Sequence, residues 1–157
     1  MLALDHAVIP IWDVEASLAF YGETLELPLA QTVTGDDWGG HPWLMLIYTL
    51  AGGRELVLVA LRGARRPAPD GLPADVRHYA LAAPSREAQD AIEARLAAAD
   101  AEVTLEMHGD RRSLYAVDPN GVVIEITWPA SESPVTARPD ALARARAWLA
   151  DAAALTQ

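Results

Sequence analysis

The sequence predicts an α+β fold made of two copies of one β-α-β-β-β module, followed by a C-terminal helix. Two histidines, His6 and His78, each lie in a short β-like segment and stand 72 residues apart (78 − 6). Seven residues after each histidine comes a residue type typical of helix N-caps, Asp13 and then Ser85, again 72 apart (85 − 13). One amphipathic pattern and three β-like segments follow each cap. This matched spacing indicates an internal repeat, which determines the fold.

Each module has one expected helix and three expected strands after it. The apolar positions that recur on one helical face are Val14, Leu18, Tyr21 and Leu25 in the first module and Ala88, Ile92, Leu96 and Ala99 in the second. The strands expected next are 29–34, 43–50 and 55–61 in the first module, and 102–107, 113–117 and 122–128 in the second. Turn residues separate the last two strands of each module, Gly52-Gly53 and then Asp118-Pro119-Asn120-Gly121.

A chain of 157 residues is long enough for one domain with one hydrophobic core. The expected divisions are a single domain over 1–128, with module 1 at 1–63, a proline-marked linker at 64–74 and module 2 at 75–128, then a second linker at 129–139 and a C-terminal helix at 140–157. The apolar side of that helix carries Leu142, Ala145, Trp148 and Leu149, and we expect it to pack on the domain or on a partner subunit.

Two residue types are absent, because the chain has no cysteine and all twelve of its basic residues are arginine. These absences exclude thiolate nucleophiles, disulfides and Cys-ligated metals, and also Schiff-base lysines and P-loops. The 22 acidic residues and the net charge of −10 disfavour a nucleic-acid partner, since a polyphosphate needs a basic face. The apolar runs are far shorter than the roughly 18 to 20 residues of a membrane-spanning helix, and the first residues lack signal-peptide features. We therefore expect a cytoplasmic protein that binds neither nucleic acid nor membrane.

The paired modules and two sequence segments resemble the vicinal oxygen chelate superfamily, which includes glyoxalase I, extradiol ring-cleaving dioxygenases and bleomycin-resistance proteins. The segments are LDHAVIPIWDVEASLAFYGETLELPL and LYAVDPNGVVIEI, and the most specific parts are SLAFYGETLEL and DPNG followed by a strand with a central glutamate. The resemblance covers residues 1–128. It implies a cupped barrel of the glyoxalase/dioxygenase type that encloses a divalent metal ion and a small substrate with adjacent oxygens.

The resemblance also implies the metal ligands, which are His6, His78 and Glu125. Strand alternation places Glu125 on one face with Val123 and Thr127, and a carboxylate in such an apolar strand is costly to bury unless it is paired or bound to a cation. Two histidines and one carboxylate leave open positions on the metal, as in non-heme iron(II) sites. Iron(II) is the first expectation, with manganese(II), nickel(II) and zinc(II) as alternatives.

The fourth ligand of the glyoxalase I type is missing from its expected place. Glu125 stands four residues after Gly121, whereas Val57 stands four residues after Gly53. Glu55 has the same strand parity as Val57 and is a possible fourth ligand, one ladder step away. The sequence therefore favours an extradiol-dioxygenase-like oxidoreductase. Two alternatives stay open: a glyoxalase I-like lyase or isomerase, and a non-enzymatic bleomycin-resistance-like protein whose five tryptophans and acidic charge suit a cationic drug.

Two further side chains are candidates for the reaction. Tyr115, ten residues before Glu125, resembles the family tyrosine that hydrogen-bonds a substrate oxygen, although an ordinary amphipathic strand residue would fit the same pattern. His108 lies in the turn-like HGDRR and is either a catalytic acid or base, since histidine titrates near neutral pH, or a solvated loop residue. We also expect a homodimer, in which the modules pair either within one chain or between two chains.

Overall fold

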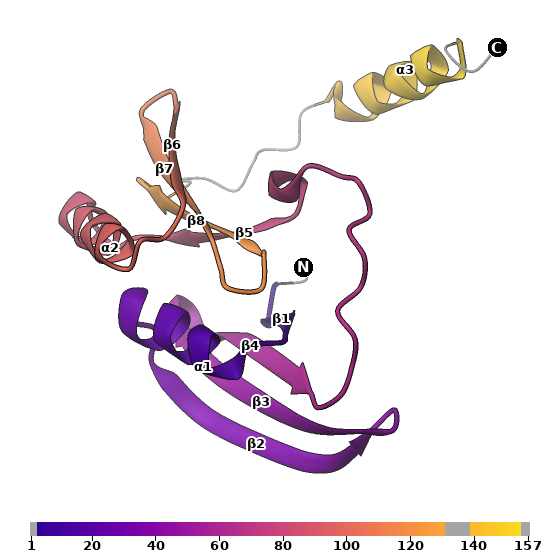
Figure 1. Cartoon of the computed structure of the whole chain (residues 1–157). Helices are drawn as coiled ribbons and strands as arrows, with labels where there is room; N and C mark the ends of the chain where they lie inside the picture. The colour runs from indigo at the N-terminus through magenta and orange to yellow at the C-terminus, as the bar shows by residue number, and fades with distance from the viewer. Residues whose placement is uncertain (1–2, 131–138, 155–157) are drawn as a thin grey trace.

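The computed structural model describes residues 3–130 and 139–154, which form two four-stranded sheets and three α-helices (Figure 1). The first module consists of β1 (His6–Ile11), α1 (Val14–Ser17), η1 (Leu18–Thr24), β2 (Leu29–Trp38), β3 (His41–Leu50), η2 (Ala51–Gly53) and β4 (Arg54–Leu61). The second consists of η3 (Ala74–Val76), β5 (His78–Ala82), α2 (Arg86–Ala98), β6 (Val103–His108), β7 (Arg111–Val117) and β8 (Val123–Trp128), and α3 (Ala141–Ala154) follows. The predicted β-α-β-β-β repeat is confirmed.

The two sheets have the same strand order. Sheet A runs β1-β4-β3-β2 and sheet B runs β5-β8-β7-β6. The first strand of each module is parallel to the last one, and the other neighbours are antiparallel. Both sheets are open, so β1 and β5 are edge strands, and Figure 1 shows them near each other in the middle of the molecule.

Strand register aligns the two modules residue by residue. Val8 is the partner of Val57 in sheet A, and Ala80 is the partner of Glu125 in sheet B. The offset between Val8 and Ala80 is again 72 (80 − 8), the same as between the two histidines. Val57 therefore occupies the position in the first module that Glu125 occupies in the second.

One hydrophobic core joins both sheets, η1 and α2. We call the face of each sheet that supplies this core its inner face, and the opposite face its outer face. Leu56 and Leu58 of β4 and Ile124 and Ile126 of β8 point inward, so the residues between them point outward.

The N-terminal caps of both module helices are confirmed. Asp13 Oδ1 accepts a hydrogen bond from the Ala16 backbone nitrogen at 2.9 Å, and Ser85 Oγ accepts one from Ala88 at 3.2 Å. The first helix departs from the expected α-helix because η1 is a π-helix, whose last turn includes a bond from the Leu25 nitrogen to the Phe20 carbonyl at 2.9 Å. The wider turn still brings Phe20 and Tyr21 into the core.

Two segments lie outside the sheets and the module helices. One is the connection that follows β4, and the other is helix α3. Arg66 donates to the Asn120 carbonyl oxygen, and its guanidinium carbon lies 5.6 Å from the centre of the Trp12 ring, which ties this connection to both modules.

The side chains of Leu142, Trp148 and Leu149 on α3 are 62–70% exposed, so this apolar side does not pack on the domain. The expected linker at 129–139 lies largely outside the described residues. Within 3–130 and 139–154, no helix combines the length and apolar character needed to cross a bilayer.

Candidate metal centre

His78 and Glu125 meet on the outer face of sheet B. Nε2 of His78 lies 3.1 Å from Oε2 of Glu125. Glu125 stands in the middle of β8 and is only 7% exposed, while His78 begins the neighbouring strand β5. Since His78 pairs in register with Val123, it lies one ladder step from Glu125 on the same face. The structure thus brings together two of the three predicted ligands.

Hydrogen bonds on the far side of each group orient this pair. Nδ1 of His78 lies 2.7 Å from the Asp75 carbonyl oxygen, which can only accept, so Nδ1 carries a proton and Nε2 faces Glu125. Ser113 Oγ donates to the other carboxylate oxygen, Oε1, at 2.5 Å. A carboxylate oxygen next to an unprotonated Nε2 would place two lone pairs opposite each other. A proton or a metal ion between Nε2 and Oε2 would relieve this repulsion.

The separation of the pair fits both possibilities, since an ordinary N–H···O hydrogen bond spans about 2.7–3.2 Å and two ligands of one metal ion lie at a similar distance. Ligand atoms at about 2.1 Å from one ion and at right angles to each other are about 3 Å apart. The observed 3.1 Å agrees with that value. An acceptor on the remote nitrogen of a metal-binding histidine is also the usual arrangement, because it fixes the tautomer that presents Nε2.

His6, the third predicted ligand, lies in the other sheet. Its Nδ1 is 2.9 Å from Oδ2 of Asp5, so this histidine too has an acceptor at Nδ1 and Nε2 left for a ligand. Within residues 3–130 and 139–154, however, no three histidine, aspartate or glutamate side chains converge closely enough to hold one metal ion. The donor chemistry of His78 and Glu125 fits a metal, but the described part of one chain does not bring His6 to them.

Glu55, the possible fourth ligand, is the register partner of His6 in β4. The two residues are neighbours on parallel strands and share the outer face of sheet A. Glu55 is exposed, whereas Val57, one ladder step further, is 6% exposed. In the first module the carboxylate residue is the register partner of the histidine, whereas in the second module Glu125 lies two residues beyond the partner of His78.

The two predicted catalytic side chains contact each other beside this pair. Tyr115 is the cross-strand partner of Glu125, and its hydroxyl oxygen lies 3.1 Å from Nε2 of His108. Burial, and after it the negative charge of Glu125, raise the pKa of Tyr115, so the phenol keeps its proton near neutral pH. Glu106 Oε2 lies 3.5 Å from the same His108 nitrogen. His78, Tyr115 and Glu106 line a cavity of about 310 Å³.

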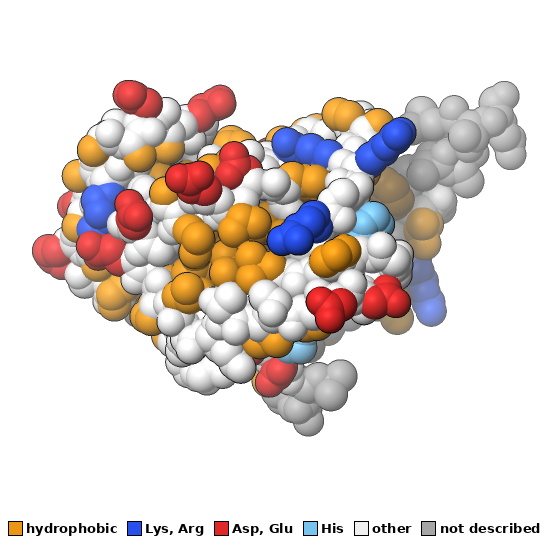
Figure 2. Space-filling view, turned by 60° about the horizontal axis from the view of Figure 1, so that its bottom comes forward, with side chains coloured by type: hydrophobic (Ala, Val, Ile, Leu, Met, Phe, Trp, Pro, Cys, Tyr) orange, Lys and Arg blue, Asp and Glu red, His pale blue; other side chains and the backbone are white. Residues whose placement is uncertain are grey.

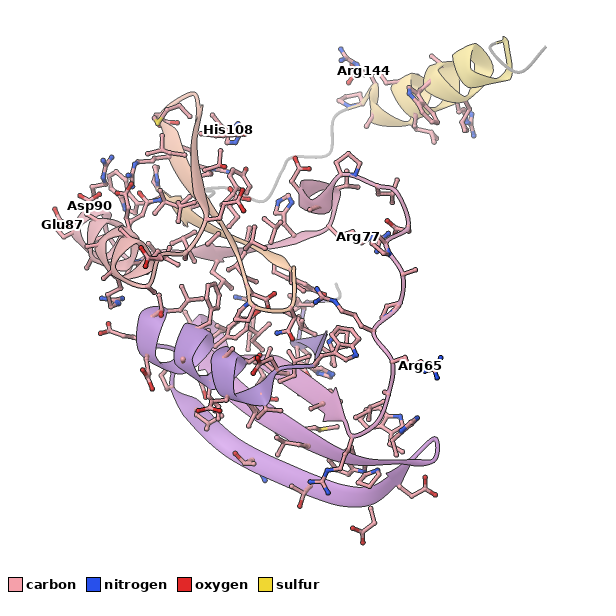
Figure 3. All side chains as sticks on the ribbon, viewed as in Figure 1. Arg65, Arg77, Glu87, Asp90, His108 and Arg144 are labelled. Carbon is pink, nitrogen blue, oxygen red and sulfur yellow. The ribbon has the colours of Figure 1, made fainter. Side chains whose placement is uncertain are left out.

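His108 ends strand β6 instead of lying in the turn that the sequence suggested. It pairs with Arg111 in the β6–β7 hairpin. Figure 3 shows it on the side of this hairpin away from Glu87 and Asp90 of α2. The extra strand residue places the imidazole on the outer face of sheet B with Tyr115.

Sequence reasoning did not identify Ser113 or Asp75 as parts of the site. Ser113 is fully buried and shares strand parity with Tyr115, so a serine two positions before that tyrosine in an apolar strand was the available signal. The contribution of Asp75 comes from its backbone carbonyl, which no side-chain pattern reveals.

The outer faces of the two sheets differ in chemistry at equivalent positions. On sheet B the outward cross-strand pairs are Tyr115 with Glu125 and Ser113 with Thr127. The equivalent pairs on sheet A are Ile47 with Val57 and Met45 with Val59. Figure 2 brings the side of sheet A forward, and hydrophobic side chains gather in the middle of that view.

Comparison with known proteins gives one family and one fold. A family model described as the Glyoxalase/Bleomycin resistance protein/Dioxygenase superfamily matches residues 3–126. No curated protein sequence matches the chain significantly. The structure is similar to a glyoxylase/bleomycin resistance protein/dioxygenase domain from Frankia sp. EAN1pec, with 23% identity and a TM-score of 0.62 over 81% of this chain and 97% of that one.

Two further similar structures carry different activities in their names. The oxidase ChaP-H2 has 22% identity and a TM-score of 0.58 over 84% of this chain and 97% of its own. The trypanothione-dependent glyoxalase I of Leishmania major has 19% identity and a TM-score of 0.61 over 80% of this chain and 86% of its own. At these identities the similarity establishes the fold and not the reaction.

Proposed function

The chain belongs to the Glyoxalase/Bleomycin resistance protein/Dioxygenase superfamily, and from this membership we propose that it is a metal-dependent enzyme of the extradiol-dioxygenase type. Its substrate would be a small molecule that binds the metal through two adjacent oxygens. The observation that carries the proposal is the contact of 3.1 Å between His78 Nε2 and Glu125 Oε2, with acceptor and donor groups behind each partner. The proposed ligands are His78, Glu125 and His6, and the proposed metal is iron(II).

A divalent metal ion held there would act as a Lewis acid on the substrate and would hold its adjacent oxygens side by side. The protonated hydroxyl of Tyr115 is placed to donate a hydrogen bond to a substrate oxygen in the cavity beside Glu125. His108 Nε2 lies 3.1 Å from the same hydroxyl oxygen and helps to hold it in position. Val123 and Val117 supply apolar surface to the same cavity.

We further propose that a second copy of the chain supplies His6, in a homodimer. Two observations support this arrangement. The described part of one chain does not assemble three ligands, and the edge strands β1 and β5, which begin with the two histidines, have no strand partner on one side. Unpaired strand edges are ready to pair with another chain. A groove of about 850 Å³, with apolar residues such as Leu4, Ala7 and Tyr79, follows β5 and reaches the start of β1.

A second candidate function is a lyase or isomerase of the glyoxalase I type. The observation that favours it is the register pairing of Glu55 with His6, which places a fourth carboxylate beside a proposed ligand. In that case Glu55 would bind the metal or move a proton next to a substrate carbonyl. Against it, Glu55 is one ladder step from the position equivalent to Glu125.

The metal content of the purified protein tests the proposal. We expect about one divalent ion per chain after loading, which Glu125→Ala abolishes and Glu102→Ala retains, because Glu102 lines the same cavity without a contact to His78. Full metal occupancy in Glu125→Ala would contradict the ligand set. Oxygen consumption with iron(II) and a catechol supports the dioxygenase, whereas nickel- or zinc-dependent turnover of an aldehyde–thiol adduct supports the second candidate. A protein that stays metal-free and binds a glycopeptide drug would overturn both.

A further inference from the structure

A cavity of about 600 Å³ lies on the inner face of sheet A, at one end of the sheet. Its floor is one row of register partners that crosses all four strands, namely Ile11, Ala60, Leu44 and Thr34. Ile11 belongs to the hydrophobic core, so this row faces the core side of the sheet. The cavity shares no lining residue with the cavity beside His78. Its volume is typical of a small-molecule site, which spans about 300–1,000 Å³.

The internal repeat shows why this place is open in the first module. Ala60 and Trp128 stand 68 residues apart (128 − 60), as do Val57 and Glu125 (125 − 57), so Ala60 and Trp128 occupy equivalent positions. The Trp128 side chain packs against the hydrophobic core. The first module therefore has a methyl group where the second has an indole ring.

The neighbouring position in the same row differs in the same sense. Leu44 is the register partner of Ala60, and Arg112 is the partner of Trp128. Arg112 is only 6% exposed, and its Nη1 donates to Oε1 of Gln89 in α2 at 3.0 Å. The second module thus fills this place with its own indole and guanidinium groups, whereas the first module leaves a cavity there.

Two side chains of opposite charge line the cavity and have no partner of their own. Arg62 stands two residues after Ala60, and Asp36 two residues after Thr34, so both continue the strand parity of the floor. Among the described residues, neither side chain forms a hydrogen bond or an ion pair, not even with the other. The backbone of Arg62 is held, because its nitrogen donates to the Pro42 carbonyl oxygen at 2.8 Å. Only the guanidinium group is left for a ligand.

Two tryptophans also line the cavity, and protein contacts hold both rings. The guanidinium carbon of Arg66 lies 5.6 Å from the centre of the Trp12 ring. The Trp43 ring lies edge-on to Trp38, with 5.8 Å between ring centres, and against Gly35, where a Cβ atom would collide with it. Aromatic surfaces that are already held in place favour a flat ring, because binding then orders few side chains.

We propose that this cavity is a ligand site separate from the candidate metal centre, and that it binds a small planar aromatic molecule carrying one ammonium and one carboxylate group, as an aromatic amino acid does. The ring would lie over Ala60, where the second module has its own indole. The ammonium group would face Asp36, and the carboxylate would face the guanidinium of Arg62. The site stands apart from the proposed metal-dependent function, because none of its groups contacts His78 or Glu125.

Three indole probes test this proposal on the full chain. They are L-tryptophan, tryptamine, which lacks the carboxylate, and indole-3-propionate, which lacks the ammonium group. Calorimetry at pH 7 gives their dissociation constants. We expect L-tryptophan to bind about tenfold more tightly than either of the other two, because each charged hydrogen bond contributes a factor of that order. Equal affinities for the three probes, or no binding of L-tryptophan, would overturn the proposal.

Two charge variants assign the groups. Arg62→Gln should weaken L-tryptophan and indole-3-propionate about tenfold and leave tryptamine unchanged. Asp36→Asn should weaken L-tryptophan and tryptamine and leave indole-3-propionate unchanged. The matched control is Arg65→Gln, because Arg65 does not line the cavity and projects away from the sheets in Figure 3. If Arg65→Gln weakens L-tryptophan as much as Arg62→Gln does, net charge explains the binding and the proposal is wrong.

A third variant tests the position of the ring. Ala60→Trp introduces the residue that the second module has at the equivalent position, so it should abolish L-tryptophan binding while Arg62 and Asp36 stay in place. Ala60→Leu is a smaller filling in case the first variant does not fold, and it should weaken L-tryptophan about tenfold. Circular dichroism checks the fold of both. Undiminished binding of L-tryptophan by either folded variant would overturn the proposal and leave the proposed metal-dependent function untouched.

Discussion

Asn120 accepts a hydrogen bond at its Oδ1 atom from the backbone nitrogen of Trp12, at 2.8 Å. The same oxygen lies 3.2 Å from the Asp13 nitrogen, and Nδ2 donates to Ser17 Oγ at 2.9 Å. Asn120 belongs to the DPNG turn of the second module, whereas its three partners surround the start of the first module's helix. The turn that helps to identify the superfamily therefore joins the two modules and takes no part in the proposed chemistry.

Asn120→Ala should lower the free energy of unfolding by about 2–4 kcal/mol, because it leaves two backbone nitrogens without their acceptor where Asn120 is 4% exposed. It also removes the bond to Ser17 Oγ, although that hydroxyl keeps its own bond to the Asp13 carbonyl oxygen. Urea denaturation measures the change. The control is Asp37→Ala, which removes an equally short bond, 2.8 Å to the Gly40 nitrogen, at an exposed turn. A similar fall in the free energy of unfolding in both variants would contradict the role of Asn120 in joining the two modules.

Tyr21→Phe should make the free energy of unfolding less sensitive to alkaline pH. The Tyr21 hydroxyl donates to Asp118 Oδ2 at 2.9 Å, and burial together with the charge of Asp118 raises the pKa of Tyr21. A raised pKa of an acid in the folded state stabilises the fold below the unfolded value of about 10, and this contribution is lost as pH rises above it. The wild-type unfolding free energy should therefore fall above about pH 10, more steeply than in Tyr21→Phe. Parallel pH profiles of the two proteins would contradict this.

Tyr48→Phe should not destabilise the fold at neutral pH, in contrast to Tyr21→Phe. The Tyr48 side chain is fully buried, and within the described residues its hydroxyl has no hydrogen-bond partner. Removing an unsatisfied buried hydroxyl should leave the unfolding free energy unchanged or raise it by up to about 1 kcal/mol, whereas Tyr21→Phe, which leaves Asp118 short of a donor, should lower it. Thermal unfolding of both variants at pH 7 makes the comparison, and a clear destabilisation in Tyr48→Phe would indicate a bound water.

The repeat was predictable because spacing and strand alternation are local properties. His6 and His78, Asp13 and Ser85, and the position of Val57 all follow from counting along the chain, and the structure places each of them at the expected register. The extension of β2 to Trp38 was missed because Gly35, Asp36 and Asp37 are typical turn residues. Tertiary hydrogen bonds, such as those from Ser113 and to Asp75, leave no periodic signal in a single sequence.

The convergence of His6 with His78 and Glu125 was predicted from equivalent positions alone. Equivalence within a repeat establishes which strand and which face a residue occupies, but not whether two faces meet. That depends on how the modules are paired, which is a tertiary or quaternary property. In the described part of one chain, the prediction of proximity holds for His78 and Glu125 within one module and does not extend to His6 in the other.

Ser113→Ala should weaken metal binding without removing a ligand. Ser113 Oγ holds Oε1 of Glu125 at 2.5 Å and so fixes which carboxylate oxygen faces His78. Loss of such a supporting hydrogen bond should raise the metal dissociation constant by about 10- to 100-fold. Competition with a chelator gives the constant. Thr127→Val is the control, since Thr127 lies 3.3 Å from the same hydroxyl and has no bond to Glu125 in this structure, and equal weakening in both variants would contradict the assignment.

Mixing two defective chains should restore metal sites if a second copy supplies His6. His6→Ala and Glu125→Ala each remove one proposed ligand, so each variant alone should bind little metal. In a mixed dimer whose cups combine modules from two chains, one cup receives both mutations and the other receives neither. Random assortment should then recover about a quarter of the wild-type metal content. If each cup instead forms within one chain, every cup keeps one defect and mixing recovers nothing. Co-refolding the two variants, with Glu125→Ala refolded alone as the control, decides between these pairings by metal content, because only pairing between chains brings an intact His6 to an intact Glu125.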